Sequence, residues 1–115
     1  MKKEYMLYAM TLGLIGDAIN EMIDAIEEKS PKGVKGAAKR FTSVATTIKE
    51  ETTPDIFASE HQELVEAFKL WNVANKQATA MRDENIVEAA SAALNKHEGF
   101  LVGIMDRIYD KLRNS

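Results

Sequence analysis

The chain contains no cysteine among its 115 residues, which excludes disulfide bonds and thiolate metal sites. Because disulfides mark oxidising compartments, their exclusion favours a cytoplasmic protein. The charge balance is mild, with a formal net charge of −3 and both signs mixed along the chain. Nucleic-acid binding needs a basic surface, so this balance argues against a nucleic-acid partner.

No apolar run is long enough to cross a membrane, because a spanning helix needs roughly 20 apolar residues. The longest uncharged stretch covers only residues 5–16, and it follows Lys2 and Lys3, an arrangement also found at the start of export signals. Against that interpretation, Glu4 interrupts the basic region, no small-residue cleavage site follows, and the helical pattern continues to residue 26. We therefore expect the first helix of the fold here, with a processed export signal as the alternative.

What the chain does contain is an apolar residue at every third or fourth position along four segments, which is the period of one helix face. The segments cover residues 3–28, 31–51, 54–81 and 83–113. The first and last have the clearest stripes, formed by Tyr8, Leu12, Ile15, Ile19, Met22 and Ile26 and by Val87, Ala90, Leu94, His97, Leu101, Ile104, Ile108 and Leu112. No segment alternates with period two, so we expect an all-α protein.

The boundaries between the segments carry signals of their own. Ser30 before Pro31 and Thr53 before Pro54 each place a capping side chain ahead of a proline at the first helical position. Residues 82–85 contain neither glycine nor proline, but the apolar stripe shifts phase there, which favours a tight turn over one continuous helix. Short connections make successive helices antiparallel neighbours. The prediction is one domain covering the whole chain, folded as an antiparallel up-down-up-down four-helix bundle.

Charged residues indicate how the first two helices pair. Carboxylates recur along one side of the first segment and lysines along the second, and folding the chain near residue 30 brings the two rows together. We expect the cross-helix pairs Glu28–Lys32, Asp24–Lys35 and Glu21–Lys39. The alternative is an anion site formed by Lys32, Lys35, Lys39 and Arg40.

Small residues are concentrated on three of the segments. They are Ala9, Gly13 and Gly16, then Gly33, Gly36, Ala37 and Ala38, and finally Ala89, Ala90, Ala92 and Ala93. Glycine inside a helix costs about 1 kcal/mol relative to alanine, so we expect these positions to allow close packing of helices. A partner helix docked on them is the alternative.

Residues for catalysis are scarce. The sequence has no nucleophile elbow, no phosphate-binding loop and none of the Glu-x-x-His or His-Glu-x-x-His patterns of metal sites on helices. We predict no enzymatic activity, no catalytic residue and no bound metal, with the carboxylates on solvated faces. His61 and His97 both lie on apolar stripes, roughly 9 Å apart along the bundle if the turn lies near residue 82. We expect His97 beside Trp71.

His61 has a second interpretation, because the same count places Met105 and Met10 near its level, and a histidine facing a methionine can ligate haem iron. The chain here resembles the cytochrome b562-type four-helix bundles, through Thr53-Pro54, then His61, Leu64 and Val65, then Val87, Glu88 and Ala89. That resemblance implies a b-type haem held by a methionine near the start, for which Met6 or Met10 would serve, and a histidine near the end. The second ligand has no counterpart, because Tyr109 stands in that region.

With no chemistry assigned, apolar residues outside the stripes are the strongest functional indication. They lie at the start of the first helix and beside the stripe of the last: Tyr5, Met6, Leu7, Met10, Phe100, Val102 and Tyr109. One bundle buries only one face of its last helix, so these residues indicate a second surface. We predict a small soluble protein-interaction or structural module that acts on a partner protein or as a dimer. The alternative is a haem-binding bundle that uses His61 with Met105 or Met10.

Overall fold

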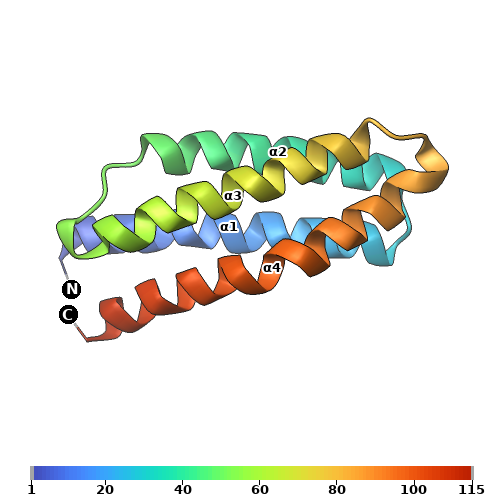
Figure 1. Cartoon of the computed structure of the whole chain (residues 1–115). Coiled ribbons are helices and arrows are strands. Elements are labelled where there is room, and N and C mark those ends of the chain that lie inside the picture. Colours follow the sequence, from blue (N-terminus) through green and yellow to red (C-terminus); the bar gives the residue numbers. More distant parts are fainter. Residues whose placement is uncertain (1, 115) are drawn as a thin grey trace.

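Between residues 2 and 114, the range that the structure describes, the chain forms four long α-helices that run up and down in turn (Figure 1). In this computed structural model they are α1 (Lys3–Glu27), α2 (Pro31–Glu50), α3 (Ala58–Thr79) and α4 (Asp83–Arg113), with a 3-10 helix, η1 (Asp55–Phe57), ahead of α3. The molecule measures 47 × 20 × 20 Å. None of the described helices has the length and apolarity needed to cross a bilayer. The predicted all-α, antiparallel four-helix bundle is confirmed.

The bundle has two distinct ends. We call the end where α1 begins and α4 ends the terminal end, and it also carries the connection from α2 to α3 (Figure 1). The opposite end holds the α1–α2 and α3–α4 connections, and we call it the turn end.

The α1–α2 connection follows the sequence signals closely. Lys29 takes a left-handed conformation, with φ of 53°, directly after α1 ends. Ser30 then caps α2, because its side-chain oxygen accepts a 2.9 Å hydrogen bond from the Gly33 N–H, and Pro31 occupies the first turn. A cap of this kind contributes about 1 kcal/mol. The predicted cap at Ser30 is confirmed.

The α2–α3 connection differs from the prediction. Thr53 does not cap a helix, because its hydroxyl donates to the carbonyl of Glu51 at 3.3 Å, and α3 begins only after η1. A 2.9 Å bond from the Phe57 N–H to the Pro54 carbonyl closes η1. The physical reason is Phe57. The 3-10 turn carries its ring into the core, where it is fully buried and stacks on Tyr8 with ring centroids 5.2 Å apart.

The α3–α4 connection is the tight turn that the phase shift favoured. α3 ends at Thr79, and Arg82 is extended, with φ of −64° and ψ of 150°, immediately before α4. Asp83 lies in the first turn of α4, where a carboxylate suits the positive end of the helix dipole. It also pairs with Lys35 of α2 at 3.1 Å. α3 and α4 are therefore separate helices.

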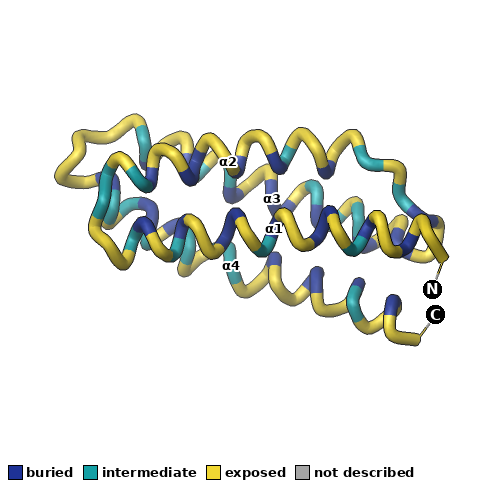
Figure 2. Tube along the Cα trace, turned by 180° about the vertical axis from the view of Figure 1, so that it is seen from behind, coloured by how far each residue is buried: buried dark blue, intermediate teal, exposed yellow. Residues whose placement is uncertain are grey.

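Aromatic residues form two clusters in the core. At the terminal end Tyr8 stacks on Phe57. Further along the bundle, Phe41 contacts Phe68 and Trp71, with ring centroids 4.9 and 4.8 Å apart. Buried positions line the inner sides of the helices and exposed positions their outer sides (Figure 2). Aromatic area on this scale is a large part of what holds such a bundle together.

α4 departs from its predicted stripe. Ile86 is fully buried, whereas Val87 is only half-buried. The same shift by one residue recurs a heptad later, where Ala93 is buried and Leu94 is half-buried. One residue is about 100° around a helix, so the inner side of α4 is turned in its first half relative to the predicted stripe. None of residues 94–100 is fully buried, so the middle of α4 is covered less completely than its ends.

The four helices are not evenly spaced. α2 and α4, on one diagonal, have Cα atoms within 8 Å of each other, whereas no described residues of α1 and α3 approach so closely. α2 and α4 offer small buried side chains such as Ala37 and Ala90. Across the wide diagonal, Tyr8 of α1 reaches His61 of α3 with a 2.6 Å hydrogen bond. The helices of the narrow diagonal thus carry small buried side chains, and large rings bridge the wide diagonal.

The glycines divide into one packed position and five open ones. A Cβ added at Gly33 would lie 3.2 Å from the side chain of Ala25 and 3.0 Å from the hydroxyl of Ser30. The expected close packing is confirmed there. It is wrong for Gly13, Gly16 and Gly36, where an added Cβ would meet no neighbouring atom of the described chain within 4 Å, and the same holds at Gly99 and Gly103, for which no close packing was predicted.

The rows of opposite charge on α1 and α2 meet in a different register from the predicted one. Arg40 pairs with Glu21 at 3.5 Å, and Lys35 pairs with Asp83 of α4 instead of α1. The close α2–α4 diagonal brings the start of α4 beside α2. Among the described residues, no ion pair joins Glu28 to Lys32, Asp24 to Lys35 or Glu21 to Lys39. Exposed pairs contribute only about 0.2–1 kcal/mol each, too little to hold that register.

Candidate interaction surfaces and histidine sites

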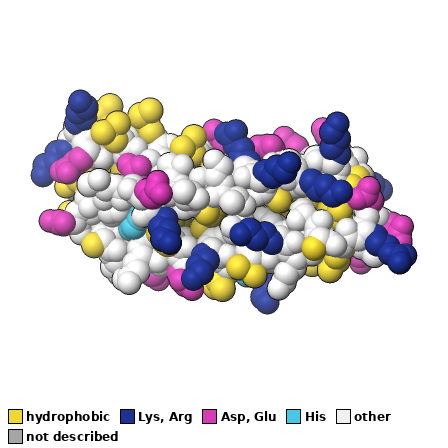
Figure 3. Space-filling model, turned by 90° about the horizontal axis from the view of Figure 1, so that it is seen from above, with side chains coloured by type: hydrophobic (Ala, Val, Ile, Leu, Met, Phe, Trp, Pro, Cys, Tyr) yellow, Lys and Arg dark blue, Asp and Glu magenta, His cyan; other side chains and the backbone are white. Residues whose placement is uncertain are grey.

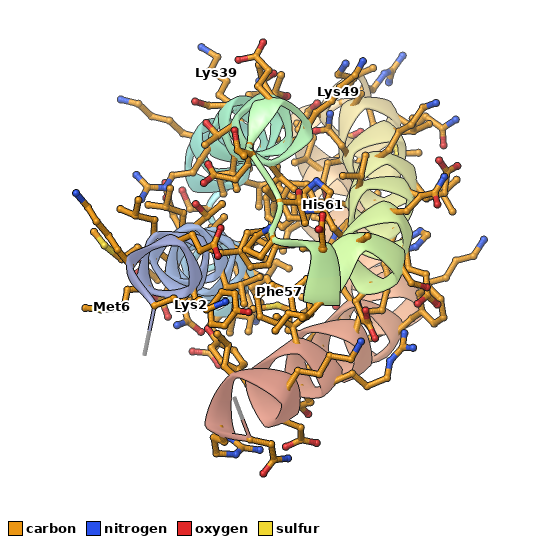
Figure 4. All side chains as sticks on the ribbon, turned by 90° about the vertical axis from the view of Figure 1, so that its left-hand side faces the viewer. Lys2, Met6, Lys39, Lys49, Phe57 and His61 are labelled. Atoms are coloured by element: carbon orange, nitrogen blue, oxygen red, sulfur yellow. The ribbon has the colours of Figure 1, made fainter. Side chains whose placement is uncertain are left out.

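Four large apolar side chains stand on the outer side of α1, in its first half. The exposed fractions are 54% for Met6, 49% for Leu7, 69% for Met10 and 38% for Leu14. Figure 4 shows Met6 on the outer side of α1, pointing away from the other helices. Hydrophobic side chains also gather near the start of α1 in the view of Figure 3. Met6, Leu7 and Met10 are exposed as expected, and Leu14 extends the row by one more turn.

Tyr5 corrects the sequence prediction, which placed it on the same exposed surface. Only 8% of Tyr5 is exposed, and its ring lies against Phe57 with centroids 5.6 Å apart. Lys2 covers the ring from the other direction, with its Nζ 5.4 Å from the centroid. The sequence did contain a signal for this burial. Tyr5 precedes Tyr8 by three residues and so extends the inner apolar stripe of α1 by one step toward the N-terminus.

The apolar residues predicted on α4 lie in three different environments. Phe100 is 63% exposed, and Val102 is 36% exposed on the opposite flank, because two residues are about 200° apart around a helix. Tyr109 is half-buried against the core, and burial raises the pKa of its hydroxyl. Tyr109 is therefore a partly buried residue and not part of a free surface.

Contacts between α3 and α4 define how the two helices are aligned. Arg107 donates to Glu63 at 3.0 Å. Leu70 follows Glu63 by seven residues, and Phe100 precedes Arg107 by seven, so these two side chains stand at one level on the same outer side. Leu70 is 52% exposed. Leu70 was not among the predicted surface residues, although its position outside the apolar stripe of α3 was a usable signal.

A groove between α3 and α4 continues from this level toward the turn end. It has a volume of about 360 Å³, and small side chains form most of its floor. Lys96 and His97 line one side, and the exposed Met81 stands at its far end. The lining residues include Ala74, Gln77, Ala78, Ala89, Ala92 and Ala93. Leu70, Phe100 and this groove together form what we call the α3–α4 face.

His61 lies between α1 and α3 at the terminal end, and Figure 4 shows it and Phe57 among the helices. Its Nδ1 is 2.6 Å from the hydroxyl oxygen of Tyr8, and the two rings are in tilted contact. Burial lowers the pKa of His61, and the charge of Glu51 opposes this effect. Burial raises the pKa of Tyr8 well above its usual range. Both side chains are thus neutral near pH 7, so the tautomer of His61 decides whether the Tyr8 hydroxyl or the Nδ1–H is the donor.

Of the residues in the haem hypothesis, Met10 is not brought together with His61. Met10 is on the outer side of α1, whereas His61 lies on the inner side of the bundle. The Glu63–Arg107 pair places His61 level with Tyr109, four residues or about 6 Å along the axis from the buried Met105. The count from residue 82 was wrong, because α4 is displaced along α3 relative to a symmetric hairpin.

His97 lies beside Trp71, as expected, with nearly parallel rings whose centroids are 6.4 Å apart. Trp71 is ten residues from His61, so the two histidines are about 15 Å apart along the bundle and not 9 Å. Burial lowers the pKa of His97, and the neighbouring Lys96 acts in the same direction. No group of three or more His, Asp or Glu side chains among residues 2–114 is arranged to hold a metal ion.

One carboxylate is buried, contrary to the prediction that all of them line solvated faces. Glu60 is only 8% exposed, and its Oε1 lies 2.6 Å from the Nζ of Lys111. This hydrogen bond lowers the pKa of Glu60 despite the opposing effect of burial. The same Nζ donates to the carbonyl of Ile56 at 2.9 Å. Lys111 therefore ties the end of α4 to η1 and the start of α3.

A further groove lies at the turn end, between the start of α4 and the α1–α2 connection. It has a volume of about 740 Å³ and is lined by Ile26 and Val87 together with Asp83, Glu84 and Glu88. Lys29 lies on its rim. Its polar side chains are exposed to solvent, so this groove has no built ligand site.

Comparisons with known proteins add no relationship. No protein-family model, no curated protein and no solved structure matches the chain. Of the likeness to cytochrome b562-type proteins, the structure shows the four-helix architecture.

Proposed function

We propose that this protein is an interaction module that binds a helix of a partner protein on its α3–α4 face, and that it catalyses no reaction. The observation that carries the proposal is the pair formed by Leu70 and Phe100, which are 52% and 63% exposed at one level of the bundle. Large apolar side chains grouped on an ordered surface mark interaction sites. Aromatic anchors of this kind dominate the binding energy of interfaces.

The shape of the α3–α4 face supports a helix as the bound element. An amphipathic helix binds by laying its apolar side into a groove between two helices. The alanine floor allows close approach, and Phe100 lies one helical turn beyond Lys96 of the groove wall, where it can serve as an anchor. Gly99 and Gly103 flank Phe100, and each leaves open space where a side chain would otherwise stand.

The test is capture of the partner from the native cell by the tagged full chain, compared across three variants. Phe100→Ser and Leu70→Ser remove the two anchors, and Val102→Ser makes a comparable change on the opposite flank of α4. We expect the two anchor variants to bind the partner about thirtyfold more weakly. The Val102→Ser control should bind as the unmodified chain does.

Two results would refute this proposal. One is a partner that the anchor variants retain in full, since it must then bind another surface. The other is the absence of any partner that is retained by Val102→Ser and lost by Phe100→Ser. Urea unfolding of each variant checks that the exposed substitutions leave the fold intact.

A further inference from the structure

The outer face of α1 takes no part in the core or in the α3–α4 face. Lys3, Met10 and Asp17 form one row along it, because they are spaced by seven residues, and all three are exposed. Among the described residues, no ion pair includes Lys3 or Asp17. The positions beside the row are Met6, Leu7, Gly13 and Leu14. The face therefore has a cation at one end, apolar residues in the middle and a carboxylate at the other end.

We infer that this face binds the same face of a second copy of the chain, with the two α1 helices antiparallel and related by a two-fold axis at Met10. Such an axis brings a residue before Met10 opposite the residue that follows Met10 by the same interval. Lys3 then lies opposite Asp17 of the second copy, and Asp17 lies opposite the second Lys3. The face is complementary to itself in charge, which is the reason for choosing a second copy as the occupant.

The apolar residues match in size under the same two-fold axis. Met6 lies opposite Leu14 of the second copy, and Leu7 lies opposite Gly13. Gly13 leaves open space, since an added Cβ would meet nothing within 4 Å. Glycine in a helix costs about 1 kcal/mol relative to alanine, and the single chain gains no packing in return at this position. A second helix with Leu7 in that space provides the packing.

Charge also selects the antiparallel orientation. α1 carries five carboxylates and one lysine, and all carboxylates but Glu4 lie in its second half. A parallel pair would bring Lys3 beside Lys3 and the two acidic halves beside each other. The antiparallel pair places the acidic halves at opposite ends of the contact, each beyond the first turn of the other α1.

A membrane surface is the competing occupant, because Lys2 and Lys3 precede the apolar row. A helix that lies on an anionic bilayer needs cations along its polar flank. Here the same side continues into Asp17, Glu21 and Asp24, which anionic headgroups would repel. The second copy is therefore the occupant that the charges favour.

The contact is small, so the dimer is expected to be weak. Residues 3–17 span about 22 Å of helix, and one helix pair buries less than the area of a standard stable interface. We expect reversible association with a dissociation constant in the micromolar range, visible in sedimentation equilibrium over a concentration series.

Charge reversal tests the register. Lys3→Asp and Asp17→Lys should each weaken the dimer about tenfold, since each places like charges together at both ends of the contact. The double variant Lys3→Asp with Asp17→Lys should restore it, because opposite charges meet again. Asp24→Lys is the matched control: it makes the same charge change outside the contact and should not weaken association.

Met10 tests the position of the axis. Met10→Lys places two cations face to face and should abolish the dimer, and its 69% exposure means that the fold tolerates the change. Because the chain has no cysteine, a single Met10→Cys should oxidise to a disulfide-linked dimer. Gln62→Cys, exposed on α3, should remain monomeric under the same conditions.

Three results would overturn the inference. They are a monomer at every concentration, a dimer that Met10→Lys leaves intact, and a monomer that binds anionic lipid vesicles through Met10. Failure here is distinct from failure of the α3–α4 proposal, because Phe100→Ser and Leu70→Ser leave the α1 face unchanged.

Discussion

The two ends of the bundle are packed in opposite ways. At the terminal end, the rings of Tyr8, Phe57 and His61 fill the space between α1 and α3, which stay apart. At the turn end, Gly33 and neighbouring small residues let the helices approach closely. The two ends of the bundle should therefore be sensitive to different substitutions. Substitutions that remove side-chain volume should destabilise the fold most at the terminal end. Substitutions that add side-chain volume should destabilise it most at the turn end.

The largest expected effect is at the terminal end. Phe57→Ala removes a fully buried ring that contacts two tyrosines, and it should destabilise the fold by about 3–5 kcal/mol. Ile56→Ala, one residue earlier on η1 at a position with 38% exposure, is the matched control and should cost much less. Urea unfolding followed by circular dichroism measures both. Equal losses for the two variants would show that the Phe57 ring does not fill the wide diagonal.

A smaller effect is expected from the polar contact at the same end. Tyr8→Phe keeps the ring but removes the hydrogen bond to His61, which should cost about 1 kcal/mol. In the tautomer in which the hydroxyl of Tyr8 donates to neutral His61, its loss should raise the pKa of His61 toward the ordinary value of 6.5. An NMR titration of the two imidazole rings measures this, with His97 as the internal control. A further fall in the pKa of His61 would mean that Nδ1 is the donor.

The same pKa determines how stability depends on pH. Burial holds the pKa of His61 below 6.5, so the folded chain binds this proton less readily than the unfolded chain does. Above pH 6.5, His61 is neutral in both states and its protonation does not reduce the free energy of unfolding. As the pH falls from 6.5 toward the lower pKa of the folded state, the unfolded chain binds the proton first and the free energy of unfolding decreases. If the Tyr8 hydroxyl is the donor, Tyr8→Phe should make this decrease smaller, because it brings the pKa values of the folded and unfolded states together.

The smallest effects compare glycines on one helix. Gly36→Ala should stabilise the chain by about 0.5–1 kcal/mol, since its Cβ meets no other atom and alanine is the better helix former. Gly33→Ala should give no such gain, because its Cβ would be only 3.2 Å from the side chain of Ala25. Thermal unfolding of the pair measures the difference. An equal gain at both positions would contradict the close packing of the turn end.

The predictions from sequence succeeded where the signal was local. The helix of residues 31–50 was predicted almost to the residue, because the cap at Ser30 and the proline after it act within one turn. The same pattern at Thr53 misled, because the burial of Phe57 determines where α3 begins. The burial of Glu60 was missed for a related reason: it depends on Lys111, which lies at the far end of the chain.

The residues of the candidate surfaces also differ in whether a local pattern or the alignment of the helices identifies them. Met6, Met10 and Phe100 could be named in advance, because each stands outside an apolar stripe. That Leu70 stands at the same level as Phe100 became visible only in the tertiary structure, where the Glu63–Arg107 pair aligns α3 with α4. The haem hypothesis depended on the same alignment, and an error of a few residues brought Met105 too close to His61.

The period of the sequence was enough to specify an antiparallel bundle of four helices and, outside the first half of α4, the side of each helix that turns inward. Both follow from the period of apolar residues and from capping residues, which act over three or four positions. The tertiary structure alone decided how far each helix is displaced along its neighbour, which diagonal is narrow, and which residues share a level. The physical reason is that a repeat of three or four residues specifies the direction of a side chain around the axis. It leaves the offset along the axis to the packing of particular side chains, such as Phe57 at one end and Gly33 at the other.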